Sequence, residues 1–294
     1  MPDDGVTATL ESERPALRGL AYRMLGNLSD ADDAVQDAFL RWVRLGADQR
    51  ARIDNPGAWM MRVTSRICLD MLGSARVRRE TYVGPWLPEP VPVGMPAGHA
   101  GDPLDRVTLD DSVSMALQVV LHTLTPAERV AFVLHDVFEL PFAQIADTVG
   151  RSVEATRQLA SSARRKVRAR TDDAAPRERH DEVAAAFAAA TGTGDFDALV
   201  AVLDPDVTLT SDGGGKVSAA RRPVLGAANV ARFILGVLTQ RPHVRVSPIA
   251  TADGLGFVVS EDGVVDTVIV LGVRGERVSD VWLVRNPDKL TSWR

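Results

Sequence analysis

A proline-rich segment near the middle of the sequence limits the folds open to this chain more than any other feature. Between Tyr82 and Pro103 it carries six prolines with interspersed glycines, namely Pro85, Pro88, Pro90, Pro92, Pro96 and Pro103. Proline has no amide hydrogen to donate and holds its φ angle nearly fixed, so this stretch can continue neither a helix nor a sheet ladder. We therefore predict an extended linker over residues 81–104 that follows an N-terminal domain of residues 1–80.

The segments on either side of the linker show helical periodicity. Apolar residues recur at three- and four-residue spacing, first in Leu17, Leu20 and Met24 and again in Val35, Phe39 and Trp42. A second helical block runs to about Arg170 and closes in a charged segment. These patterns predict two all-α domains, over residues 1–80 and 105–172.

Residues 178–294 have a different pattern. Two helices are expected over 181–191 and 196–203, and strand-like alternation follows over 244–249, 256–260, 264–273 and 278–284. Helices followed by strands predict a separate α+β domain with an antiparallel sheet. The predicted fold class is therefore multidomain, with two all-α domains and one α+β domain.

The second helical block has the signals of a helix-turn-helix. Thr125, Pro126 and Glu128 form a capping box with proline at the first helical position, and Gly150 allows a tight connection before a helix that starts near Val153. That last helix carries polar and basic residues suited to base edges and phosphates, namely Arg157, Gln158, Ser161, Arg164, Arg165, Lys166 and Arg168. The same cations also suit a solvated helix C-terminus, but the preceding helix and turn favour DNA binding.

A helix expected over residues 29–42 has two different faces. Val35, Phe39 and Trp42 face inward, whereas Asp33, Gln36, Asp37 and Leu40 share the opposite face. An acidic face with one exposed leucine suits a basic helical partner. The next helix starts at residues 55–56, where Asn55 is the expected N-cap and Pro56 occupies the first turn.

In this order the segments resemble the extracytoplasmic-function (ECF) class of sigma-70 RNA polymerase sigma factors. The acidic helix resembles region 2.2, which in the family docks on the clamp helices of the largest polymerase subunit. Residues 55–79 resemble regions 2.3 and 2.4, which open and read the promoter −10 element, and the helix-turn-helix resembles region 4, which reads the −35 element. The resemblance implies −10 contacts from Arg62, Ser65, Arg66, Arg76, Arg78 and Arg79. For Trp59, a core aromatic role is favoured over stacking on a flipped base.

Three further motifs resemble the SigJ-like subgroup, whose members carry a fused SnoaL-like domain, a cone of the nuclear-transport-factor-2 type. They are residues 86–90 (WLPEP), 212–216 (DGGGK) and 286–290 (NPDKL). In that subgroup the C-terminal domain acts as a built-in regulator that communicates with the linker. The resemblance implies regulatory contacts from Trp86, Leu87, Pro88, Asp212, Gly213, Gly214, Lys216, Asn286, Pro287, Asp288 and Lys289.

The residues of these motifs leave some alternatives open. Trp86 between prolines suits docking in a groove, but it also suits local packing on a helical domain. The glycines before Lys216 lack the spacing of a phosphate-binding loop, because Val217 follows the lysine, so we expect a turn with Lys216 projecting toward a neighbouring domain.

Composition excludes several other classes of protein. The single Cys68 excludes an internal disulfide and is expected to be a small buried residue, and the absence of a long apolar run predicts a cytoplasmic protein without membrane contact. The net charge of −5 excludes a generally basic coat but not local basic patches. Scattered carboxylates and one nearby histidine do not indicate catalysis, so no enzymatic activity, cofactor or metal is expected. These residues are Asp204, Asp206, Asp266, Asp280 and His243.

The sequence thus predicts an alternative sigma factor whose partners are core RNA polymerase, through the clamp helices, and promoter DNA. An unidentified small molecule in the C-terminal cone is a further candidate partner. Two other hypotheses stay open: a one-component ligand-sensing helix-turn-helix regulator, and an isomerase or cyclase with an accessory DNA-binding region. Whether the C-terminal domain activates or restrains transcription does not follow from the residues.

Overall fold

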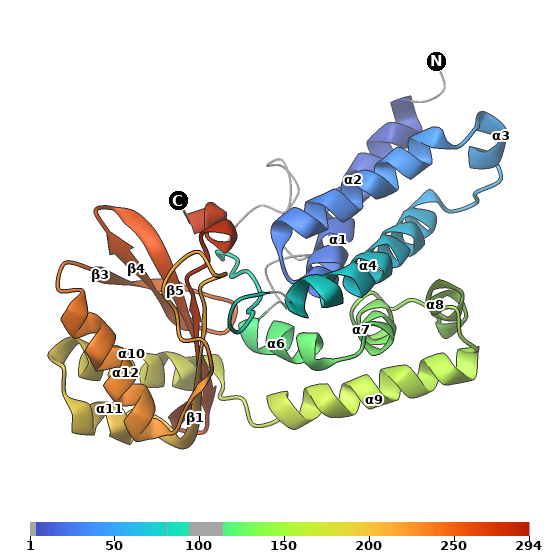
Figure 1. The fold of residues 1–294 in the computed structure, drawn as a ribbon. Helices are drawn as coiled ribbons and strands as arrows, with labels where there is room; N and C mark the ends of the chain where they lie inside the picture. Colours follow the sequence, from blue (N-terminus) through green and yellow to red (C-terminus); the bar gives the residue numbers. More distant parts are fainter. Residues whose placement is uncertain (1–3, 81, 94–113, 294) are drawn as a thin grey trace. The chain divides into compact units, whose positions relative to one another are not determined.

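The chain folds into two compact units (Figure 1). A computed structural model describes residues 4–80, 82–93 and 114–293. The helical unit contains residues 4–78 and 117–169, and the α+β unit contains the described residues of 79–93 together with 114–116 and 170–293. The first part of the predicted linker, up to residue 93, therefore belongs to the α+β unit. Linker residues 94–104 and the expected start of the second helical domain lie outside the described residues.

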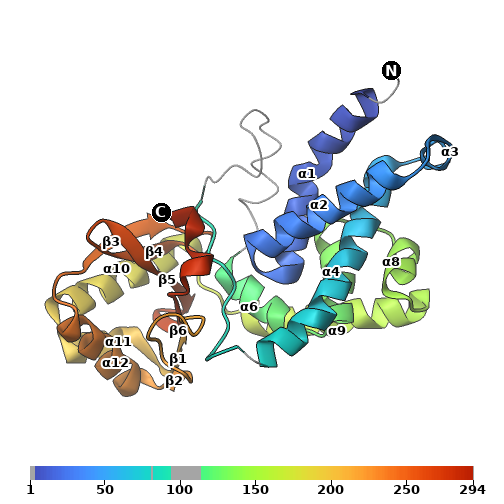
Figure 2. The same cartoon turned by 45° about the horizontal axis from the view of Figure 1, so that its top comes forward.

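The first half of the helical unit consists of α1 (Asp4–Leu25), α2 (Leu28–Arg44), α3 (Ala47–Arg50) and α4 (Pro56–Glu80), and α1 and α2 lie side by side (Figure 2). Asn27 caps α2, because its side chain accepts a hydrogen bond from the Asp30 amide at 2.6 Å. Asn55 caps α4 as predicted, accepting from the Ala58 amide at 2.9 Å. The inner face of α2 buries Val35 and Trp42.

The second half contains the predicted helix-turn-helix. Its elements are α6 (Met115–Thr123), α7 (Pro126–Phe132) continued by the π-helical turn η1 (Val133–Val137), α8 (Phe142–Val149) and α9 (Val153–Thr171). The capping box is confirmed: the Glu128 amide donates to the Thr125 hydroxyl at 3.3 Å, and the Glu128 carboxylate accepts from the Thr125 amide at 2.9 Å. Gly150 ends α8 with a φ of +68°, a left-handed conformation that glycine adopts without steric cost.

The two halves of the helical unit contact each other at the C-terminal end of α1. The last carbonyls of a helix have no partner within it, and here side chains from α6 and α7 fill that role. The Arg129 guanidinium donates to Met24 O at 2.6 Å, and Gln118 Nε2 donates at 3.4 Å to Tyr22 O, which also accepts from the Gly26 amide at 2.7 Å. A cation is favoured at this position because the C-terminal end of a helix carries partial negative charge.

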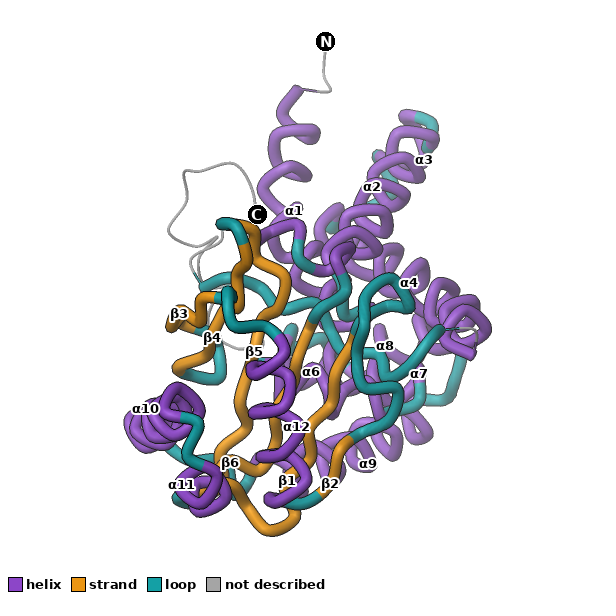
Figure 3. The backbone as a smooth tube through the Cα atoms, turned by 60° about the vertical axis from the view of Figure 1, so that its left-hand side comes forward, coloured by secondary structure: helices purple, strands orange, loops and turns teal. Residues whose placement is uncertain are grey.

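The α+β unit packs three helices on one face of a six-stranded sheet (Figure 3). Its helices are α10 (Arg177–Thr193), α11 (Phe196–Val202) and α12 (Ala227–Gln240). Its strands are β1 (Leu203–Asp212), β2 (Val224–Leu225), β3 (Arg245–Ala250), β4 (Leu255–Glu261), β5 (Val264–Arg274) and β6 (Arg277–Val284). The core between the two layers includes Phe187, Leu199, Val230, Leu271 and Val281.

Strand order β2-β1-β6-β5-β4-β3 corrects the predicted antiparallel sheet, because β1 pairs with β6 in parallel. The sheet is therefore mixed. A parallel pair needs a long crossover connection, and here the chain between β1 and β6 contains α12 and the four strands β2 to β5. The sequence pattern predicts β3 to β6 and the first two helices, but not α12, β1 or β2.

Replacing Arg129 with methionine tests the join within the helical unit. Arg129→Met keeps much of the apolar stem but removes a buried charged donor from Met24 O, so we expect it to lower the free energy of unfolding by about 2 kcal/mol. Urea unfolding of the full chain, followed by circular dichroism, measures this change. Arg151→Met, at an exposed site, is the matched control and should stay within about 0.5 kcal/mol of wild type. Equal stability of the two variants would contradict the assignment.

Candidate nucleic-acid interface and linker latch

Helix α9 exposes most of the residues predicted to contact DNA. Its buried side consists of Thr156, Ala160, Ala163 and Val167. The opposite side exposes Arg157, Gln158, Ser161, Arg165 and Arg168. The structure therefore leaves these five side chains accessible on the second helix of the helix-turn-helix, the element that enters the major groove in proteins of this motif.

Two other cations of α9 are engaged within the helical unit. Lys166 Nζ donates to both carboxylate oxygens of Glu128, at 2.8 and 2.9 Å, and Arg164 Nε donates to Asp136 at 2.5 Å. Burial raises the pKa of Glu128, but the hydrogen bonds from Lys166, Thr125 and Ser162 outweigh burial and bring this pKa to about 2. Part of the predicted phosphate-binding charge therefore stabilises the fold instead.

Helix α4 gives a mixed result for the predicted −10 contacts. Arg62 is half-buried and Arg66 is exposed, and the Arg66 guanidinium donates to Asp147 O of α8 at 2.9 Å. Ser65 is buried, and its hydroxyl donates to Met61 O at 2.7 Å. The predicted DNA contact of Ser65 is not compatible with this conformation, because the hydroxyl is buried and bonded to a carbonyl of α4. The side chains of Arg76, Arg78 and Arg79 lie outside the described residues.

The predicted acidic surface of α2 is accessible. Asp33 and Gln36 are exposed, and Leu40 has 46% of its surface exposed. Asp37 pairs with Arg41 one turn later, at 2.9 Å, which leaves its carboxylate on the surface. Val43 lies on the same side of the helix with 66% of its surface exposed, and sequence analysis had not included it. Two large apolar side chains are therefore exposed beside the carboxylates of α2.

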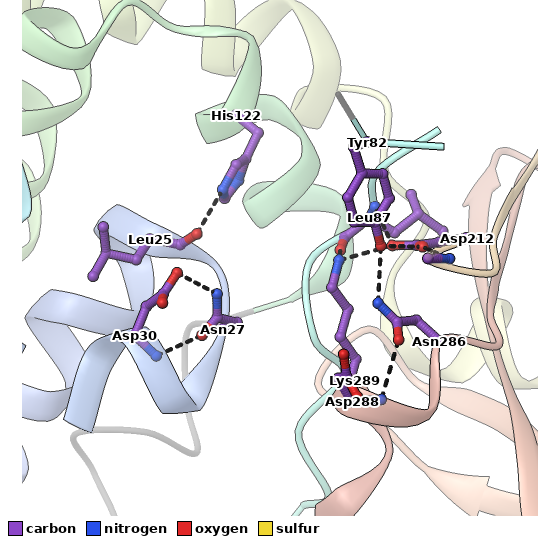
Figure 4. A network of polar contacts seen from close by, with 11 residues as sticks. Leu25, Asn27, Asp30, Tyr82, Leu87, His122, Asp212, Asn286, Asp288 and Lys289 are labelled. Atoms are coloured by element: carbon purple, nitrogen blue, oxygen red, sulfur yellow. Dashed lines mark hydrogen bonds and ion pairs between the residues drawn. The ribbon is translucent and has the colours of Figure 1, made fainter. Parts of the chain in front are cut away.

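A buried ion pair ties the linker to the α+β unit (Figure 4). Asp212, at the end of β1, is completely buried and accepts from Lys289 Nζ at 2.7 Å. It also accepts from the Leu87 amide at 2.9 Å and from the Tyr82 hydroxyl at 2.6 Å. Lys289 Nζ donates in turn to Leu87 O at 2.5 Å. The linker backbone thus completes the hydrogen bonding of both charges.

Aromatic and amide contacts surround this pair. The Trp86 ring centroid lies 4.0 Å from Lys289 Nζ, a cation–π distance, and Asn286 Nδ2 donates to the Tyr82 hydroxyl at 2.9 Å. Burial and the Asp212 hydrogen bond raise the pKa of Tyr82, which keeps its hydroxyl a donor. We call the set Tyr82, Trp86, Leu87, Asp212, Asn286 and Lys289 the linker latch.

The structure brings together five predicted contact residues: Trp86, Leu87, Asp212, Asn286 and Lys289. Pro88 and Gly213 are buried, and Pro287 starts the 3-10 turn η2 (Pro287–Lys289). Gly214 has a φ of +62°, and a Cβ there would lie 2.4 Å from Asn286 Nδ2, so this position requires glycine.

One predicted regulatory contact, that of Lys216, is wrong, and one residue of the linker latch, Tyr82, was missed. Lys216 was expected to project toward a neighbouring domain, but it pairs with Asp288 of its own unit at 2.6 and 2.7 Å. The carboxylate lies within reach because the 213–216 turn and η2 both follow strands that are neighbours in the sheet. Tyr82 belonged to no predicted set, since a single aromatic residue at the start of a linker gives no local signal of a distant partner.

A second unpredicted contact involves Asp253, in the turn between β3 and β4. Its carboxylate accepts from the Met115 amide at 2.6 Å and from the Ala116 amide at 3.1 Å, the first amides of α6. Burial raises the pKa of Asp253, while these hydrogen bonds and His180 act in the opposite direction. A residue distant in sequence thus supplies the cap that residues adjacent to a helix usually supply.

Some site types are not found among the residues that the structure describes. No helix in those ranges has both the length and the apolar character of a membrane-spanning segment. In the same ranges, no cluster of three or more His, Cys, Asp or Glu side chains has an arrangement that could hold a metal ion. Cys68 is completely buried, and burial raises its thiol pKa, which makes it an unreactive core residue.

Comparison with known proteins identifies the family. Residues 9–78 match the model of Sigma-70 region 2, and residues 114–167 match that of Sigma-70, region 4. The chain is 41% identical to the ECF RNA polymerase sigma factor SigJ of Mycobacterium tuberculosis, over 96% of this chain and 92% of that protein. It is also 41% identical to the probable ECF RNA polymerase sigma factor SigI of the same species, over 79% of this chain and 77% of that protein.

A solved structure supports the same assignment over the whole chain. The crystal structure of M. tuberculosis SigJ superposes with a TM-score of 0.75 at 38% identity, covering 97% of this chain and 98% of that one. The predicted fold class, helical sigma domains followed by an α+β domain, is confirmed, and the one-component regulator receives no support. The chain belongs to the family of ECF RNA polymerase sigma factors.

Proposed function

We propose that this alternative sigma factor binds core RNA polymerase through α2, contacts promoter DNA through α4 and α9, and is regulated by its α+β unit through the linker latch. Sigma factors are in general non-enzymatic initiation factors, and we assign this chain no chemistry of its own. The observation that carries the regulatory part is the buried Lys289–Asp212 pair, whose hydrogen bonding is completed by the linker.

The polymerase contact is assigned to Asp33, Gln36, Asp37 and Leu40, with the clamp helices of the largest subunit as the partner. Exposure of this surface supports the assignment, and so does its pairing of carboxylates with the exposed apolar side chains Leu40 and Val43. Carboxylates steer the encounter with a basic partner, while the apolar side chains supply area that is buried on binding.

The −35 contact is assigned to α9 and the −10 contact to α4. On α9 the early residues Arg157 and Gln158 have the chemistry for base edges, and Arg165 and Arg168 suit phosphates. On α4 the assigned residues are Arg62 and Arg66, with Arg76, Arg78 and Arg79 following from family resemblance. Arg66 donates to Asp147 O of α8 in this structure, so a DNA contact from its guanidinium requires that this hydrogen bond break.

The regulatory role rests on the desolvation of the latch charges. An ion pair held away from water is stabilising only when its remaining hydrogen-bonding groups are satisfied. Here the Leu87 amide and carbonyl satisfy one partner each. Release of the linker therefore exposes Asp212 and Lys289 to water or leaves them short of partners, which gives two distinct linker states separated in energy.

Charge reversal on α2 tests the polymerase contact. Asp33→Lys with Asp37→Lys is expected to weaken binding to purified core polymerase about tenfold or more, because the lysines that replace both carboxylates would repel a basic partner. Asp48→Lys with Asp54→Lys, at two exposed positions outside α2, is the matched control with the same change in net charge. Binding is measured by fluorescence anisotropy of labelled chain at fixed salt. A loss of equal size in the control would show a general charge effect and contradict the assignment.

Alanine substitutions along α9 separate base reading from phosphate binding. Arg157→Ala and Gln158→Ala should change the preference among −35 sequences, with about 1–3 kcal/mol lost at the base contacted. Arg165→Ala and Arg168→Ala should weaken binding to all sequences alike and reduce the salt slope by about one each. Promoter-specific transcription with core polymerase and a set of −35 variants provides the readout. Unchanged promoter selection in all four variants would exclude α9 as the recognition helix.

Disruption of the latch should release the linker. Asp212→Asn leaves the Lys289 charge buried without its counter-ion, so the amide hydrogens of residues 82–93 are expected to exchange at least about tenfold faster than in wild type. Hydrogen-exchange mass spectrometry of the full chain measures this rate. Lys216→Met removes the exposed Lys216–Asp288 pair and should leave the linker protected.

The same two variants test whether the latch regulates. If it does, Asp212→Asn changes the yield of promoter-specific transcripts, whereas Lys216→Met leaves it at the wild-type level. A released linker combined with unchanged transcription would contradict the regulatory role while leaving the sigma factor assignment intact.

A further inference from the structure

The α+β unit encloses a cavity of about 710 Å³ between α10, α12 and the sheet. Figure 3 shows α12 lying across the sheet on this side. Cavities of roughly 300–1,000 Å³ are typical of small-molecule sites in proteins. This volume therefore accommodates an organic molecule of substantial size.

The cavity floor is a row of side chains from four strands. Ser211 of β1 is in register with Leu283 of β6, Leu283 with Ile269 of β5, and Ile269 with Phe257 of β4. All four line the cavity. Because alternate side chains of a strand face the same side of a sheet, this register gives a continuous and largely apolar surface that suits the body of an apolar ligand.

One end of the cavity is cationic. The described residues that line the cavity include no carboxylate, and two of its arginines, Arg241 and Arg285, lie together at this end beside Asp266, whereas Arg232 contacts Asn229 and Phe196 instead. Asp266, just behind this end, pairs with Arg241 and lies 3.7 Å from the Arg285 guanidinium. Arg241 also pairs with Glu261 at 2.8 Å. Arg241 thus pairs with two carboxylates. Arg285 has one carboxylate nearby, that of Asp266, which is farther away and already paired with Arg241.

Arg285 otherwise contacts neutral acceptors. Its guanidinium donates to the Thr267 hydroxyl at 3.2 Å and to Ser218 O. Burial lowers its pKa, Asp266 raises it and the neighbouring Arg241 lowers it, as expected for a partly desolvated cation near a second cation. A guanidinium in such a place favours a carboxylate, which it can bind through two parallel hydrogen bonds.

We infer that this cavity binds an apolar organic molecule carrying one carboxylate, with the carboxylate held by Arg285 and the apolar body on the floor of Phe257, Ile269 and Leu283. The inference extends the regulatory role proposed above by giving the α+β unit a ligand class. A cationic ligand would face like charge at Arg285. An uncharged apolar ligand would bury the guanidinium without giving it a counter-ion, which is unfavourable.

A matched pair of probes tests the ligand class on the full chain without polymerase. The probes are hexanoate with a terminal phenyl group and the alcohol of the same skeleton, which differs in lacking the negative charge. Isothermal titration calorimetry should give at least about tenfold tighter binding of the carboxylate to wild type. Comparable affinity for the two probes, or no binding of either, would overturn the inference and needs no variant.

The residue assignment is tested by Arg285→Met. This variant should lose the preference for the carboxylate and bind the alcohol at least as tightly as wild type does, which also shows that the cavity remains folded. Arg245→Met, at an exposed position of β3 outside the cavity, should behave as wild type. A carboxylate preference retained in Arg285→Met would remove Arg285 from the site. Transcription with core polymerase is measured without either probe, so failure of the sigma factor function and failure of the cavity inference are separate results.

Discussion

The buried pair of Lys289 and Asp212 sets the arrangement of the linker in this protein. Removing two charges from water costs several kcal/mol for each ion, and their attraction offsets this only when the remaining hydrogen-bonding groups are satisfied. The α+β unit supplies the two charges, but Leu87 of the linker supplies an amide to one and a carbonyl to the other. The linker backbone therefore replaces water as a hydrogen-bonding partner of both charges. Leu87 must keep the backbone conformation that makes both hydrogen bonds.

The basic residues of α9 fall into two groups: some form ion pairs within the helical unit, and the others are exposed on the surface. From the sequence alone, Arg164 and Lys166 are indistinguishable from the other basic residues of the predicted DNA-binding helix. In the structure their partners are Asp136 and Glu128, and Glu128 also closes the capping box of α7. The helix-turn-helix is thus held together partly by cations of its own recognition helix. A count of basic residues overstates the charge available to DNA, because it cannot distinguish cations with internal partners.

The features that were predicted correctly are those with local signals. The Thr125–Glu128 box, Gly150 and the cap at Asn55 act within a few residues, and the spacing of apolar side chains defines the helices. The contacts that were missed join distant segments, as Asp253 does with Met115 and Tyr82 with Asp212. The latch motifs could be singled out through family resemblance, but their mutual contact depends on the parallel pairing of β1 and β6, which has no local signature.

The parallel pairing of β1 and β6 also places the cavity and the linker latch next to each other, at the C-terminal ends of these two strands. Successive residues of a strand face opposite sides of the sheet. Ser211 therefore lines the cavity while Asp212, the next residue of β1, holds the linker. Past the end of β6, Arg285 faces the cavity and Asn286 bonds to Tyr82, and the amides of both donate to Asp212 O at 2.7 and 2.9 Å. A shift of Arg285 toward a bound carboxylate would act on a backbone that also fixes Asp212, so the two sites are connected by adjacent residues.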